Sequence, residues 1–366
     1  MKHYAGLDLH SNNTVIVIIN EEEERVLKRK VSNDLSLIVE LLSPFKESLE
    51  GVVVESTYNW YWLVDGLMES GFKVHLAHPG HIEGPRGKKH TNDYDDSFHL
   101  AHLLRMNNLP QGYIYPKASR GLRDLLRKRS ILVRKRTSFV LSLGSLYNRY
   151  TGVYMEGKQL EKLTVAQLQE IFKDETTYIS ARSSLQCIKF LNTQISQVEK
   201  IVLMVHQSDP YYQRLQTVHG IGKILALTIS LETGDIRRFA HRGDFVSYCR
   251  GTGSRQTSNG KKKGEKNRKS GNAYLAWAFV EAANFSIGKC PYAKAFYEKK
   301  RKQSKLNVVA TKALASKLAR ACYYIMKNDV DYDVNRIFNN IKIKTDKGCG
   351  SKPKKGTGSK AKRLNG

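Results

Sequence analysis

Three aspartates fall within four consecutive positions of the segment HTNDYDDSFHLAHLL, residues 90–104. On a helix that begins just before them, Asp93 and Asp96 share a face with Leu100, which would turn both carboxylates toward a buried sheet. Asp95 lies off that face, where an acid in the first turn complements the helix dipole. The dipole alone could account for all three acids, so this segment does not establish a site by itself.

Two further acids stand where a carboxylate is costly to bury. Asp8 lies in an apolar strand pattern, AGLDLH, and Glu55 ends another, GVVVE. Buried carboxylates need a basic partner or a metal ion, and no basic partner is obvious from the sequence. If the first and fourth strands are neighbours, Asp8, Glu55, Asp93 and Asp96 converge at one end of a sheet. Such oxygen ligands suit Mg²⁺ or Mn²⁺, and two ions roughly 4 Å apart stabilise both reacting oxygens of an in-line phosphoryl displacement.

The composition indicates a polyanionic partner. The chain has 366 residues, 40% of them hydrophobic, and a formal net charge of +27. It is therefore long enough for two or three domains and attracts nucleic acid, with ribosomes, chromatin and acidic membrane surfaces as rivals. Five scattered cysteines indicate reduced thiols. With no targeting segment and no stretch of the ~20 apolar residues that a membrane helix needs, we expect a cytoplasmic protein without a membrane partner.

The elements that must position the acids can be read from the first hundred residues. Strand patterns cover residues 4–10, 14–20, 25–31, 51–55 and 72–77, and helix patterns cover 35–42, about 60–70, and the segment from 92. Ser11-Asn12-Asn13 has the composition of a turn, which makes the first two strands an antiparallel hairpin. Ser32 and Asn33 are the candidate N-caps of the first helix. This order predicts a mixed α/β sheet with helices on both faces, the ribonuclease H-like layout.

The rest of the chain divides into three parts. A long basic helix is expected near 117–147, and apolar residues at 188, 191, 195, 198, 202 and 205 form a heptad seam, which indicates a coiled coil or helical hairpin; an ordinary amphipathic helix is the alternative. Glycine-rich turns and short helices follow from 217 to about 335. We thus predict an α/β domain at 1–115, a helical region at 116–210, a mostly α-helical domain at 211–335 and a disordered basic tail at 336–366.

Two glycine-containing segments suggest contacts with phosphate. In TVHGIGKILALTISLETGDIRRF, Gly220 and Gly222 form a turn before a helix that opens with Lys223, as in helix-hairpin-helix motifs; a plain helix connection is the alternative. In GTGSRQTSNGKKKGEKNRKSGNAYL, a turn containing Ser258 is followed by six Lys and Arg residues, among them Lys261, Lys262, Lys263 and Lys269. From the residues alone this is a phosphate-binding loop with an incidental serine.

Several motifs in this order resemble the transposases of insertion sequence family 110, which are relatives of the Piv-type DNA invertases. They are GLDLH, VVVEST, HP followed by TND-x-x-D, GIG, and SNGKKKG. The resemblance extends to about Asp331 and implies a RuvC-like domain. Its D-E-D-D quartet falls on Asp8, Glu55, Asp93 and Asp96, and residue 97 is Ser where the family usually has Ala.

The resemblance also implies a second catalytic group. The family's S-S-G-G-K loop carries a serine that forms a covalent phosphoserine with DNA, and Ser258 aligns with the more regular of the two serines. This chain has Thr257 for the other serine and Asn259 for the first glycine, and Asn tolerates a left-handed backbone. Ser254 is a less favoured candidate nucleophile. The downstream match from Lys269 to Leu275 supports this register.

The leading hypothesis is therefore an RNA-guided DNA recombinase or transposase that uses Mg²⁺ and Ser258. The resemblance implies donor and target DNA, a structured noncoding guide RNA, and a dimer-to-tetramer assembly in a nucleoid-associated prokaryotic protein. A junction-resolvase-like nuclease without a covalent intermediate is the main alternative, followed by a noncatalytic nucleic-acid-binding protein; an actin-like kinase lacks a second phosphate loop. Target sequence, reaction outcome and the subunit origin of each group do not follow from the sequence.

Overall fold

The computed structural model describes residues 1–82, 92–205, 211–253, 256–264 and 270–341. The chain forms two compact units. The first comprises Met1–Gln207, Leu227–Asp235 and Gly253–Tyr274, and the second comprises the remaining described residues.

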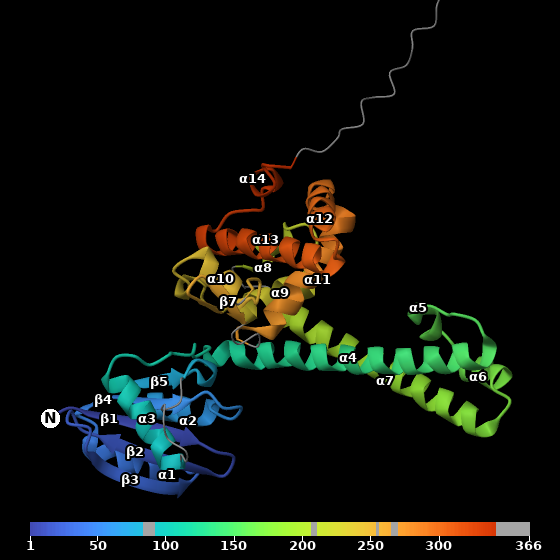
Figure 1. Ribbon diagram of the computed structural model, residues 1–366. Coiled ribbons are helices and arrows are strands. Elements are labelled where there is room, and N and C mark those ends of the chain that lie inside the picture. The colour runs from blue at the N-terminus through green and yellow to red at the C-terminus, as the bar shows by residue number, and fades with distance from the viewer. Residues whose placement is uncertain (83–91, 206–210, 254–255, 265–269, 342–366) are drawn as a thin grey trace, which may run out of the picture. The chain divides into compact units, whose positions relative to one another are not determined.

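A mixed five-stranded sheet forms the N-terminal part of the first unit (Figure 1). Its strands are β1 (His3–Leu9), β2 (Asn13–Ile19), β3 (Arg25–Ser32), β4 (Leu49–Glu55) and β5 (Val74–Ala77). The order is β3-β2-β1-β4-β5; β1, β2 and β3 pair antiparallel, and β4 and β5 run parallel to β1. The predicted hairpin, the third strand and the adjacency of the first and fourth strands are confirmed.

Helices cover both faces of this sheet, as the alternation of side chains along β1 requires. Leu7 and Leu9 pack with α1 (Leu35–Leu42) and α2 (Tyr61–Glu69) in one buried cluster. On the other face, α3 (Asp93–Arg105) lies across β1, β2 and β4. Since successive side chains point to opposite faces, Gly6 and Asp8 face α3.

Gly6 permits an unusually close approach between β1 and α3. A Cβ atom at this position would overlap the backbone oxygen of Ser97 and lie 2.8 Å from the backbone nitrogen of Ala101. Only glycine at position 6, two residues before Asp8, therefore lets the first turns of α3 lie directly on β1.

The cap of the first helix differs from its prediction. Asp34, not Ser32 or Asn33, caps α1, and its carboxylate accepts a hydrogen bond from the Ser36 backbone nitrogen at 2.8 Å. The Asn33 side chain is instead used in a tertiary contact, where it accepts from the Thr14 hydroxyl at 2.7 Å.

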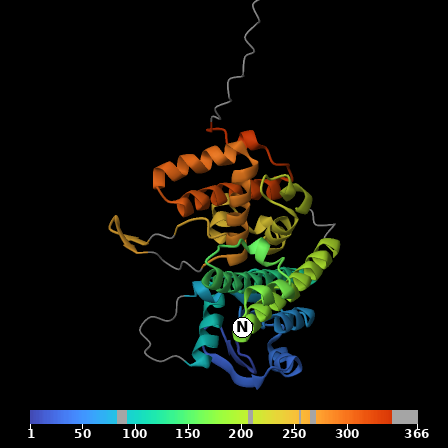
Figure 2. The same ribbon diagram turned by 90° about the vertical axis from the view of Figure 1, so that its right-hand side faces the viewer.

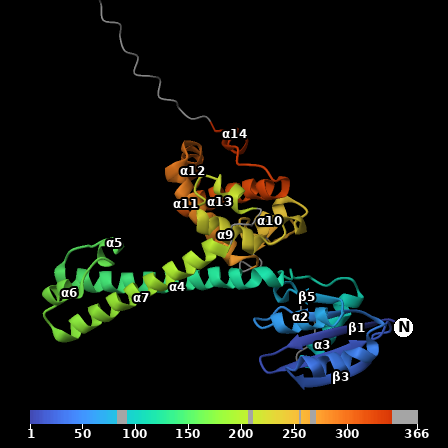
Figure 3. The same cartoon turned by 180° about the vertical axis from the view of Figure 1, so that it is seen from behind.

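Two long helices form a helical hairpin in the first unit, α4 (Lys117–Thr151) and α7 (Glu175–Val205), which run side by side in Figure 3. The short helices α5 (Gly157–Leu160) and α6 (Val165–Ile171) join the same apolar cluster. Most of the predicted heptad seam is buried, including Ile188 and Val202, whereas Val205 is 64% exposed.

The second unit is helical and contains longer helices than the sequence pattern suggested. Its elements are α8 (Tyr212–Gln216), the start of α9 (Lys223–Thr233), α10 (Arg242–Tyr248), most of α11 (Ala273–Lys289), α12 (Pro291–Ser304), α13 (Asn307–Asn328) and α14 (Val334–Ile337). Small residues such as Ala315 and Ala319 let the 22-residue α13 pack closely with its neighbours, a signal that a glycine-and-turn interpretation misses. All four described cysteines are free thiols. Among the described helices, none is both long enough and apolar enough to cross a bilayer.

The close approach at Gly6 predicts a strong difference between two Gly→Ala substitutions. Gly6→Ala should destabilise the protein by about 1–3 kcal/mol because α3 must move away from β1. Gly121→Ala, in α4, meets no atom within 4 Å and should stabilise by about 0.5–1 kcal/mol. Thermal unfolding of both variants measures this, and an equal effect at the two positions would contradict the packing described.

Candidate active site

Two of the four predicted acids stand side by side at the carboxyl ends of parallel strands. The register between β1 and β4 pairs Leu7 with Val54, which brings the following residues, Asp8 and Glu55, to the same edge of the sheet. Asp8 is 6% exposed, and Glu55 is partly buried. The parallel pairing of β1 with β4 thus explains why acids 47 positions apart in the sequence are neighbours in space.

The other two acids come from the first turn of α3. Asn92 caps this helix by accepting a hydrogen bond from the Asp95 backbone nitrogen at 3.0 Å. The buried Ser97 hydroxyl lies 3.0 Å from the carbonyl oxygens of Val15 and Asp93, and donates its single proton to one of them. Ser97 therefore does more than an alanine could, because it ties the start of α3 to β2.

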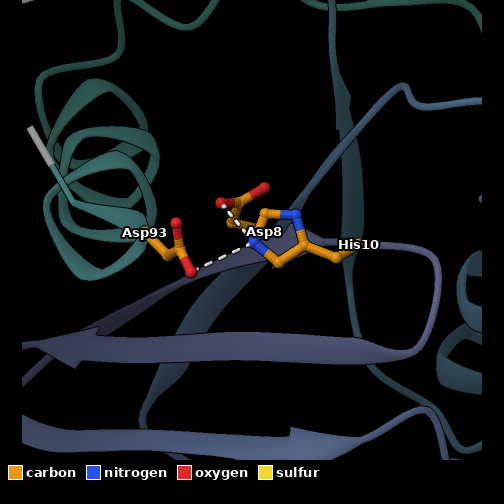
Figure 4. Close-up of side chains that lie close together, drawn as sticks. All are labelled: Asp8, His10 and Asp93. Atoms are coloured by element: carbon orange, nitrogen blue, oxygen red, sulfur yellow. Dashed lines mark ion pairs between the residues drawn. The ribbon is translucent and has the colours of Figure 1, made fainter.

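A histidine that the sequence interpretation missed joins the cluster (Figure 4). The Nε2 atom of His10 lies 3.4 Å from an oxygen of Asp8 and 3.4 Å from an oxygen of Asp93, without a hydrogen bond to either. Candidate ligand atoms of these three residues all lie within 4.8 Å of one another. Asp8 lies on β1 and His10 follows the strand directly, so the spacing D-L-H turns both side chains to one side, a signal that was available in the sequence.

The carboxylates disfavour one another's charge. Burial raises the pKa of Asp8 above its ordinary value, and the charges of Asp96 and Asp93 raise it further, although His10 acts in the opposite direction. Burial likewise raises the pKa of Glu55, with added repulsion from Asp8 and Asp96. Asp8, Glu55 and Asp96 are thus close enough to interact, and each costs free energy to ionise beside the others.

The expectation that the acids lack basic partners is wrong for the first turn of α3. Lys30 Nζ lies 3.3 Å from an Asp93 oxygen, and this hydrogen bond lowers the pKa of Asp93. Asp95 pairs with Arg25 at 2.8 Å. Both cations come from β3, an edge strand whose exposed side chains reach α3. Asp96 is itself solvent-exposed and lies at the rim of the cluster. The prediction that its carboxylate turns toward the buried sheet is therefore wrong.

This donor set fits a divalent cation. Asp8 and Asp93 offer the oxygen ligands that Mg²⁺ and Mn²⁺ prefer, and His10 offers a nitrogen atom that lacks a hydrogen bond. Glu55 and Asp96 are close enough to interact electrostatically with Asp8, but their oxygens lie outside this group of ligand atoms. Because Asp8 and Glu55 repel each other across the strand ends, positive charge placed between them is favourable.

Ser258 lies on a β-hairpin that the sequence interpretation took for a flexible turn. The strands β6 (Gln256–Ser258) and β7 (Lys261–Gly264) pair antiparallel (Figure 2). In this pairing Ser258 lies opposite Lys261. Asn259 and Gly260 both have positive φ, +50° and +72°. A two-residue Asn-Gly loop with two positive φ values is the turn that matches strand twist, so the Asn at the family's glycine position preserves the loop. Ser258 and Lys261 are exposed.

A buried carboxylate anchors the segment that carries Ser258. The Glu232 side chain is 3% exposed and receives hydrogen bonds from Arg123 at 3.0 Å, from Arg127 at 2.5 and 2.8 Å, and from Asn272 at 2.7 Å. Burial alone would raise the pKa of Glu232, but these donors hold it below its ordinary value. Asn272 also accepts from the Tyr274 backbone nitrogen at the start of α11. No periodicity in the sequence points to this network, because its members come from three distant segments.

The other predicted nucleic-acid contacts are placed only in part. Gly220 has φ +96° and approaches α11 so closely that a Cβ would lie 2.7 Å from the Ser286 backbone nitrogen. α9 begins at Lys223, which is exposed together with Gly222. Lys262 belongs to β7, and Lys263 is exposed. Ser254 and Lys269 lie outside the described residues.

The repulsion within the acid cluster predicts that a variant lacking the Asp8 charge is more stable than the natural protein. Without divalent ions at neutral pH, Asp8→Asn should raise the stability by about 1 kcal/mol or more, roughly 2–4 °C in Tm. Mg²⁺ or Mn²⁺ should raise the Tm of the natural chain, and Asp8→Asn should lose this increase. Glu22→Gln, at an exposed position outside the cluster, is the charge-matched control and should behave as the natural chain does. A destabilised Asp8→Asn protein would contradict the account.

The same substitution should show a defined pH dependence. The folded-state pKa of Asp8 is raised above the ordinary value of 3.8. Below pH 3.8 Asp8 is protonated in both the folded and the unfolded chain and has no such effect, whereas at higher pH its ionised form destabilises the metal-free protein. The stability difference between Asp8→Asn and the natural chain should therefore be close to zero at acid pH and grow as the pH rises. Denaturant titrations with EDTA across this range measure it, and a difference that shrinks with rising pH would have the wrong sign.

Two transposase family models match the chain. Residues 212–298 match the model described as "Transposase IS116/IS110/IS902 family", and residues 5–151 match the IS110 DEDD transposase model. The "Transposase for insertion sequence element IS1111A" of Coxiella burnetii is 26% identical over 211 residues, 56% of each chain, so this match spans about half of that relative. A "Putative transposase y4pF/y4sB" of Sinorhizobium fredii is 23% identical over 340 residues, 89% of this chain and 84% of the relative. The two models together cover well over half of the sequence and include both the acid cluster and Ser258, and on these matches the chain belongs to the IS110 family of transposases.

Proposed function

We propose that this protein cuts and rejoins DNA strands, with four acids that hold Mg²⁺ or Mn²⁺ and with Ser258 as the nucleophile. The observation that carries the proposal is the convergence of Asp8, Glu55 and the first turn of α3 at one sheet edge. The surplus of positive charge on the chain, +27 overall, supports DNA as the substrate.

The acids serve to hold divalent ions against a phosphodiester. Bound Mg²⁺ would neutralise charge that develops on the attacking and leaving oxygens. Asp8 and Glu55 are fixed by β1 and β4, while Asp93 and Asp96 are fixed by the start of α3. Lys30 and His10 hold Asp93 in place, and the exposed position of Lys30 lets its side chain move when the cluster takes up a cation.

Ser258 would form the covalent link. Its oxygen would bond to phosphorus while the bond from phosphorus to one deoxyribose oxygen breaks. The serine proton would pass to a base or to solvent, and the departing deoxyribose oxygen would take up a proton from solvent and leave as a hydroxyl. Its strand partner Lys261 and the exposed Lys263 would stabilise the phosphate. A later attack by another deoxyribose hydroxyl would release the serine and join the strands. The Glu232 anchor would fix the base of this segment through Asn272.

The remaining parts of the proposal rest on the family resemblance. They are a guide RNA that pairs with donor and target DNA, an assembly of two to four chains, and an acid site and a serine site contributed by different subunits. The α4–α7 hairpin supports assembly, since its surface includes Phe190 at 63% and Leu141 at 66% exposure. The turn from Gly220 to Lys223 and the lysine-bearing β6–β7 hairpin would contact phosphates. The four-part domain division and nucleoid association likewise remain proposals.

A metal-dependent nuclease that uses water is the second candidate. It is favoured by one observation, namely that the cluster of Asp8, His10 and Asp93 assembles without Ser258. Such an enzyme would hydrolyse DNA and form no protein–DNA adduct.

Substitution of Ser258 distinguishes the two. With full-length protein, the element's own noncoding RNA, DNA carrying the element ends, and Mg²⁺, Ser258→Ala should abolish the covalent adduct seen on denaturing gels. Thr257→Ala and Ser254→Ala should retain it, and they serve as matched controls. Asp8→Asn should lose both adduct and cleavage. An adduct that persists in Ser258→Ala would sink the serine assignment, whereas cleavage without any adduct in the natural chain would support the nuclease.

A further inference from the structure

The second unit contains a cavity that none of the chemistry above uses. Its volume is about 690 Å³, and it lies at α10 and the second half of α13, both labelled in Figure 1. α13 contributes residues at positions 320, 323, 324, 327 and 328, whose spacing of three and four places them on one face of the helix. The start of α10 contributes Arg242.

Positively charged side chains line this cavity. Arg242, Arg320 and Lys327 line it, and no Asp or Glu is among its lining residues in the described part of the chain. Arg242 donates to the Tyr324 hydroxyl at 2.7 Å, and Lys327 donates to the Ala240 carbonyl and the Tyr323 hydroxyl, all neutral acceptors. Arg320 is exposed and has no hydrogen bond or ion pair with any residue that the structure describes.

This arrangement is unlike that of other arginines in the same unit. Arg214, for example, binds the carboxylates of Asp329 and Asp331 at 2.5 and 3.0 Å. Positive charges that face one cavity repel each other unless an anion lies between them. The same repulsion acts between the negative charges of the acid cluster, where a cation would relieve it. The guanidinium group binds phosphate oxygens well, because its N–H donors match their geometry.

The cavity also presents an aromatic ring. Tyr324 is 37% exposed and lines the cavity, and the Arg242 guanidinium lies 6.0 Å from the centre of its ring. An unpaired base can stack on such a ring, whereas a base within a duplex cannot reach it. The volume lies within the ~300–1,000 Å³ typical of sites for small ligands.

We propose that this cavity binds one nucleotide of an unpaired nucleic-acid strand, with its phosphate at Arg320 and Arg242 and its base against Tyr324. The residues of this site include neither the four acids nor Ser258. Either DNA or RNA could supply this chemistry. The inference rests on the nucleic-acid partner proposed above but on none of the strand chemistry.

Binding of labelled single-stranded oligonucleotides, measured by fluorescence anisotropy with the full-length protein in EDTA, tests the proposal. Metal-free conditions make the result independent of the acids and of Ser258. Arg320→Gln and Tyr324→Leu should each weaken binding by roughly 5-fold or more. Arg301→Gln, at an exposed position on α12 outside the cavity, should stay within roughly 2-fold.

Parallel titrations with DNA, RNA and duplex identify the strand. Weaker binding of either single strand by Arg320→Gln and Tyr324→Leu supports the site. The kind of strand, DNA or RNA, whose affinity falls more is its ligand. Equal losses for Arg320→Gln and Arg301→Gln would mean diffuse attraction and overturn the proposal. So would an equal loss on duplex, or unchanged binding in Tyr324→Leu. Thermal unfolding of each variant excludes loss of fold as the cause.

Discussion

Several carboxylates at one edge of a sheet repel each other, and the N-terminal part of this protein is built around that repulsion. Asp8 and Glu55 are forced together by the parallel pairing of β1 and β4, and burial makes both hard to ionise. Gly6 lets the start of α3 pack against β1, and this brings the negative charges of Asp93 and Asp96 close to Asp8. His10 and Lys30 offset part of this charge. Repulsion between these carboxylates lowers the stability of the fold, and such a destabilising cluster is typical of a functional site.

Much of the sheet and of the acid quartet could be predicted from the sequence, because both depend on local patterns. Alternating β-branched residues fix the strands, and the β1–β4 adjacency follows from the order of elements. What failed depends on tertiary contacts. Neither the reach of Lys30 from an edge strand nor the choice of Asp34 as a cap has a periodic signal. Ser258 was expected in a turn, but the Asn259-Gly260 loop is itself the turn, so Ser258 belongs to the strand.

Charge is sorted by location in this strongly basic chain. Some arginines are neutralised within the first unit, where Arg123 and Arg127 surround Glu232 and fix the segment that leads to the hairpin. Others line the cavity at α10 and α13, where no Asp or Glu is among the lining residues in the described part of the chain. Cations that are paired with acids hold the fold together, and the cations that line the cavity are those that we propose to bind phosphate. Net charge alone reveals neither group, since the difference lies in which acids are nearby.

The central claim, that the acids at the β1–β4 edge bind a divalent cation, is tested most directly by anomalous diffraction from crystals of the full-length protein soaked in Mn²⁺. The account predicts a Mn²⁺ peak bonded to the carboxylate of Asp8 at roughly 2.0–2.2 Å, with further ligands from Glu55 or α3 and with Lys30 displaced from Asp93. A structure at saturating Mn²⁺ with no peak at this edge, in which Lys30 and His10 still pair with Asp93, would contradict it.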